Sequence, residues 1–239
     1  MKLRSAPLVH VLVEVKFTTP PGFTGFREEI QRRFHDLGYS RFVQSEIQHL
    51  IVGLPPAPPT MQTIPRWEFL DPASDVGFVV TPTSIILQTT GYTSFQPFVS
   101  KLRDGLAALR EVTGVTSVVR VGLRYVDLIQ PSEDETFEMF VHQGLLGFPF
   151  TMLDEALNGA LLLLTQSVAR TELGHLAVRS SILEPGVLVP PDLAGSSLRY
   201  PERFRGGRHG LAIDFDHFTE ALPLFEVDQI LTTVSSLHG

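Results

Sequence analysis

Two arginines in a strand-like run are the residues of this sequence best suited to chemistry. The run RVGLRYVDLI, residues 120–129, alternates in the way of a strand with one buried face. Arg120 and Arg124 then share a face, about 13 Å apart along the strand. Gly122 between them leaves room for a ligand or for a neighbouring side chain. Because a guanidinium binds carboxylate or phosphate through paired hydrogen bonds, this face suits an anion.

A second alternating run, LVHVLVEVKF at residues 8–17, supplies charged partners. Its odd positions from Val9 to Phe17 are apolar, whereas His10, Glu14 and Lys16 fall on the other face. We predict that these odd positions, and those from Val119 to Ile129 in the strand of the first run, pack beneath helices. Glu14 is the counterpart of Arg124 when the two runs are aligned, which favours a charge-assisted contact near the centre of a sheet. We predict that Glu14, Lys16, Arg120 and Arg124 gather on one open sheet face. They form either a groove for an anionic or amphipathic ligand or a structural ion-pair network that fixes strand register.

Two further groups of charged residues are candidates for binding. Asp214 and Asp216 in IDFDH share one strand face, which suits a hard cation only if other oxygen ligands converge; a solvated sheet face is the alternative. The basic stretch RYPERFRGGRHG, residues 199–210, suits a phosphate or an acidic partner, and a solvated loop is its alternative. From this stretch we include Arg205 and Arg208 among the predicted ligand-binding residues.

Catalytic signatures are missing from the sequence. It contains no phosphate-binding loop, dinucleotide fingerprint, zinc-protease motif or nucleophile elbow, and its eight histidines lack ligand spacing. The absence of cysteine excludes disulfides, thiolate zinc sites and cysteine nucleophiles. We therefore assign no catalytic residue, no metal site and no cofactor.

Composition is that of an ordinary globular protein. The 239 residues are 43% hydrophobic and 19% charged, and the net formal charge of -7 argues against broad nucleic-acid binding. Glu14 and Lys16 interrupt the apolar start, so we expect no signal peptide. The longest uncharged apolar stretch has about 14 residues, which is too short to cross a bilayer. We predict a cytoplasmic protein without a membrane segment.

Hydrophobic periods divide the chain into two similar halves within one compact domain. In residues 1–115 they predict strands at 8–17, 41–53, 66–71, 75–82 and 83–92, and helices within 19–39 and 94–114, the latter capped by Ser94. In residues 116–239 they predict strands at 118–129, 159–171, 174–184 and 209–218, helices at 132–148 and 223–239, and a long loop at 185–209 with at most one short strand. Trp67, Phe69, Tyr92 and Phe95 are expected in the core or at a packing seam.

The repeated order predicts an α+β fold built by internal duplication. The halves match in pattern at an offset of about 110 residues, although their sequence identity is negligible. We predict a duplicated β-α-β(3-4)-α unit that forms one curved antiparallel sheet, with helices on one face and a pseudo-twofold axis. The alternative is a single irregular α+β domain in which the similarity is accidental. An exposed edge strand at either end of such a sheet favours a homodimer.

Several segments resemble a known family in order along most of the chain. APLVHVLVEVKF, RWEFLD, GYTSFQPF, RVGLRYVDLI and LAIDFDHF look like the sporadically distributed, uncharacterised bacterial protein family whose pattern includes R-x-G-L-R-Y-x-N. Asp127 stands where that family more often has Asn. The family has no settled activity, and its patchy distribution implies horizontally transferred genes, such as defence or phage-related loci.

The leading functional hypothesis is a non-enzymatic binding module that recognises a protein partner or a small anionic ligand on the open face. One alternative is an enzyme acting on a phosphorylated or nucleotide substrate, with the arginines binding the anion and Glu14 transferring a proton or holding a metal. A third is nucleic-acid binding by the concave sheet, as in the TATA-binding protein, which has a similar order of elements; the negative charge argues against it.

Overall fold

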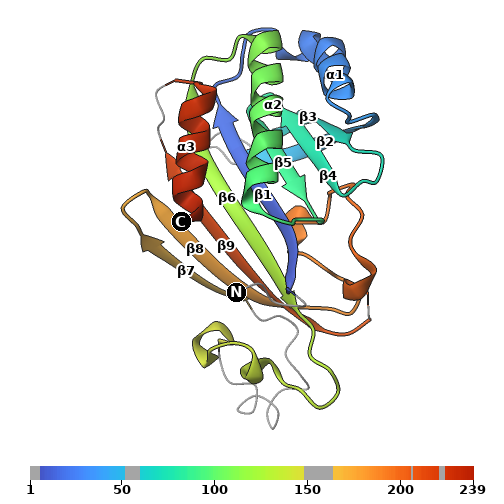
Figure 1. Ribbon diagram of the computed structural model, residues 1–239, viewed down its shortest axis with the longest axis vertical. Coiled ribbons are helices and arrows are strands. Elements are labelled where there is room, and N and C mark those ends of the chain that lie inside the picture. The colour runs from blue at the N-terminus through green and yellow to red at the C-terminus, as the bar shows by residue number, and fades with distance from the viewer. Residues whose placement is uncertain (1–5, 52–59, 148–163, 206, 221–223) are drawn as a thin grey trace.

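One antiparallel sheet organises the chain in the computed structural model, which describes residues 6–51, 60–147, 164–205, 207–220 and 224–239 (Figure 1). Within these residues, nine strands lie in the order β2-β3-β4-β5-β1-β6-β9-β8-β7, so the sheet is open, with β2 and β7 at its edges. The strands are β1 (Leu8–Phe17), β2 (Arg41–Ile51), β3 (Thr60–Leu70), β4 (Val76–Thr81), β5 (Ser84–Thr89), β6 (Val118–Ile129), β7 (Leu164–Arg170), β8 (His175–Leu183) and β9 (Gly210–Glu220). The predicted α+β class with an antiparallel sheet is confirmed.

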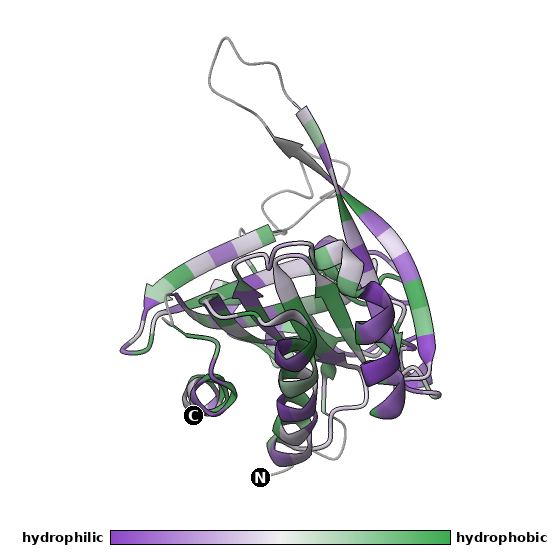
Figure 2. Ribbon diagram, turned by 90° about the horizontal axis from the view of Figure 1, so that it is seen from above, coloured by the Kyte–Doolittle hydropathy of each residue, from purple (hydrophilic) through white to green (hydrophobic). Residues whose placement is uncertain are grey.

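Helices cover one face of this sheet. Within the described ranges the α-helices are α1 (Arg27–Asp36), α2 (Phe95–Thr113) and α3 (Val227–His238). Figure 2 shows all three on the same side of the curved sheet, and hydrophobic and hydrophilic residues alternate along the strands. The sequence predicts this arrangement because each helix carries an apolar stripe and each central strand has one apolar face.

The main core fills the space between the helices and the sheet. Phe34 of α1 stacks on Phe69 of β3 with ring centroids 4.7 Å apart, and Trp67 stacks on Phe23 at 5.2 Å. Gly105 lets α2 approach β4 closely, because a Cβ at this position would lie 2.3 Å from the ring of Phe78. Trp67 and Phe69 are buried in this core, and Tyr92 and Phe95 pack against it, as predicted.

The two central strands, β1 and β6, pair antiparallel and show their polar residues on the open face. Glu14 lies opposite Gly122 and Lys16 lies opposite Arg120. Register shifts occur between Leu8 and His10 and between Lys16 and Phe17.

These shifts correct the strict alternation that we predicted. Val9 packs into a separate cluster with Val126 and Leu128 and is not part of the main core. Val118, not Val119, is buried in the main core, and Val119 is 50% exposed. Each irregularity moves a strand end by one residue, which exchanges the faces of its side chains.

Residues 184–205, here named the strap, connect β8 to β9 over the open face. The predicted loop at 185–209 has no strand in its described part, only the 3-10 turns Pro191–Leu193 and Glu202–Phe204. Val189 and Phe204 of the strap are buried in one cluster with Val126, Leu128 and Leu183 of the sheet. A second small core therefore fixes part of the strap, and the open face is partly covered by the chain itself.

The helix predicted at 132–148 is wrong over its described residues. They form two short 3-10 turns, Phe137–Met139 and Gln143–Leu145, which pack against Leu211 and Ile213 of β9. The side chain of Glu135 accepts hydrogen bonds from Ser132, a contact typical of a helix start, but the backbone bonds that follow, such as those from Glu135 to Ser132 and from Phe140 to Phe137, close single turns that do not continue. The predicted strand at 159–171 lies outside the described residues up to 163, and β7 forms its remainder.

No α-helix in the described ranges has both the length and the apolar character that a membrane span requires.

Candidate binding site on the open face

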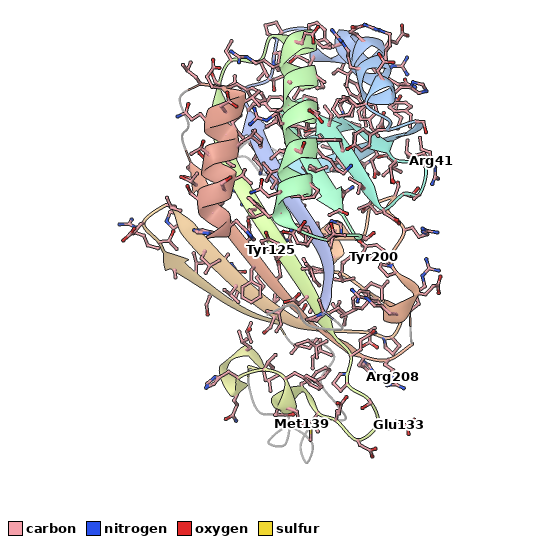
Figure 3. The ribbon with its side chains drawn as sticks, viewed as in Figure 1. Arg41, Tyr125, Glu133, Met139, Tyr200 and Arg208 are labelled. Atoms are coloured by element: carbon pink, nitrogen blue, oxygen red, sulfur yellow. The ribbon has the colours of Figure 1, made fainter. Side chains whose placement is uncertain are left out.

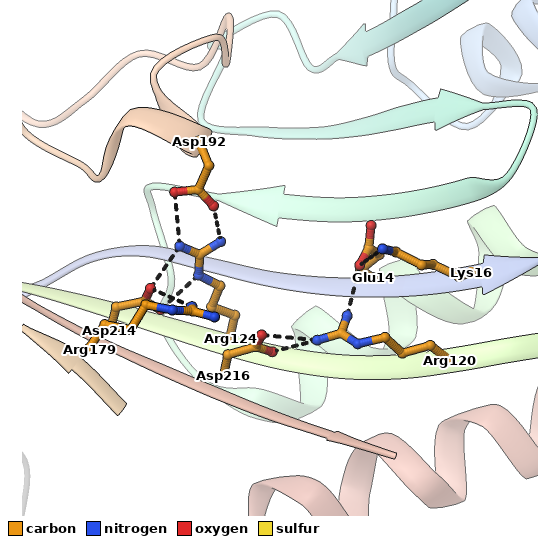
Figure 4. Close-up of polar contacts among 8 residues, drawn as sticks. All are labelled: Glu14, Lys16, Arg120, Arg124, Arg179, Asp192, Asp214 and Asp216. Atoms are coloured by element: carbon orange, nitrogen blue, oxygen red, sulfur yellow. Dashed lines mark hydrogen bonds and ion pairs between the residues drawn. The ribbon is translucent and has the colours of Figure 1, made fainter. Parts of the chain in front are cut away.

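A network of paired charges lies on the open face, over β1, β6, β8 and β9 (Figure 4). It consists of two adjacent groups with four cations and four carboxylates in all: Lys16, Glu14, Arg120 and Asp216 form one, and Arg124, Arg179, Asp192 and Asp214 form the other. All four of the predicted residues in the central strands are members, so their gathering on one face is confirmed. At neutral pH the four positive and four negative charges sum to zero.

Arg120 lies flat along the sheet between two carboxylates. Its Nη1 donates to Glu14 at 2.8 Å, and its Nη2 donates to both oxygens of Asp216 at 2.9 and 3.0 Å. Gly122 makes this possible, because a Cβ there would stand 2.8 Å from Nη1 of Arg120. The guanidinium also lies over the ring of Phe218, 4.3 Å from the centroid. The space above Gly122 is thus filled by a neighbouring side chain.

Arg124 is held by one carboxylate from the sheet and one from the strap. Its Nε and Nη2 donate to Asp214 at 2.7 and 2.8 Å, and its Nη1 and Nη2 donate to Asp192 at 2.6 and 3.2 Å. Nη1 of Arg179 adds a third cationic contact to Asp214, at 3.1 Å. Burial opposes the charged form of Asp192, but the hydrogen bonds and the charge of Arg124, together with smaller contributions from a backbone hydrogen bond and from Arg179, hold the pKa of Asp192 below its ordinary value.

Asp214 and Asp216 are therefore members of ion pairs. The solvated sheet face that we weighed for them is wrong, because the side chain of Asp214 is 2% exposed and that of Asp216 is 13% exposed. Asp214 faces the two guanidiniums of Arg124 and Arg179, which occupy the positions that oxygen ligands of a cation would need. Among the described residues, no group of three side chains has the geometry to hold a metal ion.

Two cavities remain on the open face, one on either side of the strap. The larger has a volume of about 930 Å³ and lies over β6, β8 and β9, and all eight charged residues of the network line it. Its walls include Leu12, Ile86, Phe218, Ile182, Leu183, Ser181 and Gln166. The smaller, of about 630 Å³, lies over β3, β4 and β5. Pro191, Asp192 and Leu193 line both, so this single turn of the strap divides the face.

Buried polar contacts fasten the strap to the sheet. Nδ1 of His10 lies 3.0 Å from the hydroxyl of Tyr200, Ser196 donates to Gln88 at 3.2 Å, and the backbone N–H of Ser197 donates to Glu68 at 3.1 Å. Burial, with a smaller contribution from Arg124, lowers the pKa of His10 to about 4. His10 is therefore neutral at pH 7 and anchors the strap as an uncharged hydrogen-bonding group.

Arg205 and Arg208 do not join the network. Arg205 donates to Glu202, three positions away in the strap, at 2.7 Å. Arg208, labelled in Figure 3, donates to the carbonyl of Pro131 at 3.3 Å, beside the segment that follows β6. These two arginines contact local partners and lie away from the walls of both cavities.

Two members of the site, Arg179 and Asp192, were not predicted from the sequence. Arg179 alternates with apolar residues in HLAVRSSIL, the same signal that identified Arg120, so strand parity could have found it. Asp192 follows two prolines in a loop, and no local pattern links it to Arg124, which precedes it by 68 positions.

No protein-family model matches the chain, and no curated protein matches it. The resemblance carried by RVGLRYVDLI and the other quoted segments stays a prediction.

Proposed function

We propose that the protein is a non-enzymatic binding module that takes a small amphipathic ligand into the larger cavity of the open face. The observation that carries this proposal is the volume of about 930 Å³ left between the strap and the sheet, within the range of small-molecule sites. Apolar residues such as Leu12, Ile182 and Phe218 line this cavity together with the eight paired charges. In small-molecule sites apolar walls supply affinity and fixed polar groups supply orientation.

The pairing of the charges favours binding over catalysis. An enzyme that used the arginines for substrate phosphate would have to free them from Glu14, Asp214 and Asp216 first. Glu14 accepts from Arg120 and also lies 3.7 Å from Nζ of Lys16, so two cations compete for the carboxylate that would transfer a proton. A cancelled local charge likewise gives no attraction for a nucleic-acid backbone.

A neutral fluorescent dye tests whether the cavity binds. Nile red should bind the native protein and brighten, and Ser181→Phe should weaken its binding about tenfold or more, because the ring fills space in the cavity wall. Ser167→Phe is the matched control: Ser167 is exposed, and its side chain is on the opposite face of β7 from Gln166. Equal dye binding by the native protein and the Ser181 variant, with both folded by circular dichroism, would refute the proposal.

We also propose that the sheet descends from a duplicated unit. β1 and β6 are adjacent at its centre, each half places a helix after its last strand, and the hairpins β2–β3 and β7–β8 lie at opposite edges. A rotation that carries β1 onto β6 should then carry β5 onto β9 and α2 onto α3. A superposition that matches the first strands and separates the helices would contradict the duplication.

A further inference from the structure

Two carboxylates hold Arg124, and they differ in how firmly they are fixed. We infer that the outward edge of Arg124 is a replaceable carboxylate site, filled by Asp192 in this structure and taken over by the carboxylate of an amphipathic ligand. The inference rests on the proposed binding function and names the class of ligand: one carboxylate attached to an apolar body.

Burial separates the two carboxylates. The side chain of Asp214 is 2% exposed and contacts both Arg124 and Arg179 from within the sheet. The side chain of Asp192 is 60% exposed and has Arg124 as its one ion-pair partner among the described residues. Replacing the carboxylate of Asp192 by that of a ligand therefore costs little desolvation energy. Removing Asp214 would leave the guanidiniums of Arg124 and Arg179 without their shared buried partner.

Charge balance defines what can replace Asp192. With Asp192 withdrawn, the local group of Arg124, Arg179 and Asp214 has a net charge of about +1, because only one carboxylate remains for two cations. The guanidinium of Arg124, whose side chain is 11% exposed, would also lose hydrogen-bond acceptors at Nη1. A single carboxylate restores both the charge and the paired hydrogen bonds.

The strap permits a local exchange. Asp192 lies in the short turn Pro191–Leu193, whereas the polar anchors of the strap are Ser196, Ser197 and Tyr200, which follow it. The buried Val189 holds the strap before the turn. The exposed side chain of Asp192 can therefore turn away from Arg124 while Leu193, which packs against the cluster beneath the strap, and the contacts on either side stay in place.

The same cavity receives the apolar body. Leu183, Ile182 and Leu193 line it together with Arg124, so a ligand whose carboxylate reaches Arg124 places its hydrocarbon against these side chains. Aliphatic and aromatic acids share this chemistry, and a pair of probes distinguishes them.

Calorimetric titration of naphthoate, naphthamide and decanoate into the native protein and Asp192→Asn tests the inference. The native protein should bind at least one of the two carboxylates more tightly than naphthamide. Asp192→Asn removes the internal competitor and should bind that carboxylate about 3- to 10-fold more tightly, with naphthamide unchanged. Glu202→Gln is the control, because it removes one negative charge from the same strap, in the pair with Arg205, away from the cavity.

The outcomes separate this inference from the proposal on which it rests. Unchanged carboxylate affinity in Asp192→Asn, an equal gain for naphthamide, or an equal gain in Glu202→Gln would overturn the carboxylate site, as would failure of both carboxylates to bind. In each case binding of Nile red that Ser181→Phe weakens would leave the cavity proposal standing. Tighter binding of decanoate would support the site with an aliphatic ligand, and tighter binding of naphthoate would support it with an aromatic one.

Discussion

The same strands present two very different faces. Under the helices, β1 and β6 contribute Val11, Val13, Val121 and Leu123 to a core in which they are almost fully buried. On the open face, neighbouring positions of the same strands carry Glu14, Arg120 and Arg124, whose charges are paired, and the strap covers only part of this surface. The alternation of side chains along a strand produces both faces from one pattern.

The contrast assigns different tasks to the two faces. The helix-covered face is closely packed, so its side chains determine stability. The open face retains cavities of about 930 and 630 Å³ beside polar groups that fix orientation. We therefore expect substitutions on the helix-covered face to change the free energy of unfolding without a direct effect on binding. Some substitutions on the open face should change ligand affinity with little effect on the free energy of unfolding.

The largest expected effect lies on the helix-covered face. Phe34→Ala should lower the free energy of unfolding by about 3–5 kcal/mol, because the ring is fully buried and contacts Phe69 and Phe78. Chemical denaturation measures the loss, and Nile red affinity should not change where the variant is folded. A loss below about 1 kcal/mol would show that this face is loosely packed.

On the open face, the buried carboxylate should be the most sensitive position. Asp214→Ala should lower the free energy of unfolding by about 3 kcal/mol, since it leaves Arg124 and Arg179 without their shared buried partner. Denaturation at pH 7 measures it. A variant as stable as the native protein would mean that the network is not a structural element of the sheet.

The third effect depends on pH and concerns the anchor of the strap. His10 has a pKa of about 4 in the folded chain and 6.5 ordinarily, so the unfolded chain takes up the proton first as the pH falls. The free energy of unfolding should consequently be highest above pH 6.5 and should fall towards pH 4, by about 2–3 kcal/mol.

A variant isolates this contribution. His10→Gln should lose this part of the pH dependence, and His35→Gln, at an exposed position, should keep it. Identical pH profiles for the native protein and His10→Gln, measured by denaturation between pH 7 and pH 4.5, would contradict the role of His10.

The smallest effect on stability should come from the exposed carboxylate of the same network. Asp192→Ala should change the free energy of unfolding by less than about 1 kcal/mol, because its side chain is 60% exposed and the rest of the strap is anchored elsewhere. Denaturation alongside Asp214→Ala measures the difference between the two partners of Arg124. Equal losses would show that the turn is a fixed structural element.

Much of the fold could be predicted because its signals are local. The strand at 118–129 has the predicted bounds, and the helix Phe95–Thr113 lies within the predicted 94–114. Periodicity failed in the segment predicted as a helix, where Ser132 and Glu135 make the contact of a helix start but the turns that follow do not continue. It also failed at the ends of β1 and β6, where register shifts exchange the faces of Val9, Val118 and Val119.

The candidate site could be predicted only in its central part. Glu14 and Arg120 gather because strand parity places both on the open face of adjacent strands. Asp214 joins them through the pairing of β6 with β9, which depends on the order of strands in the sheet. Asp192 reaches Arg124 through the course of the strap, which follows from buried contacts such as His10 with Tyr200, 190 positions apart.

Amide chemical shifts of ¹⁵N-labelled protein, titrated with whichever of naphthoate and decanoate binds more tightly, locate the bound ligand. The largest shifts are expected in β6, β8 and the Pro191–Leu193 turn, on the walls of the larger cavity, and small shifts in α1, α2 and α3. Shifts concentrated instead in the groove between α2 and α3, near Val99 and Leu231, would contradict the assignment of binding to the open face.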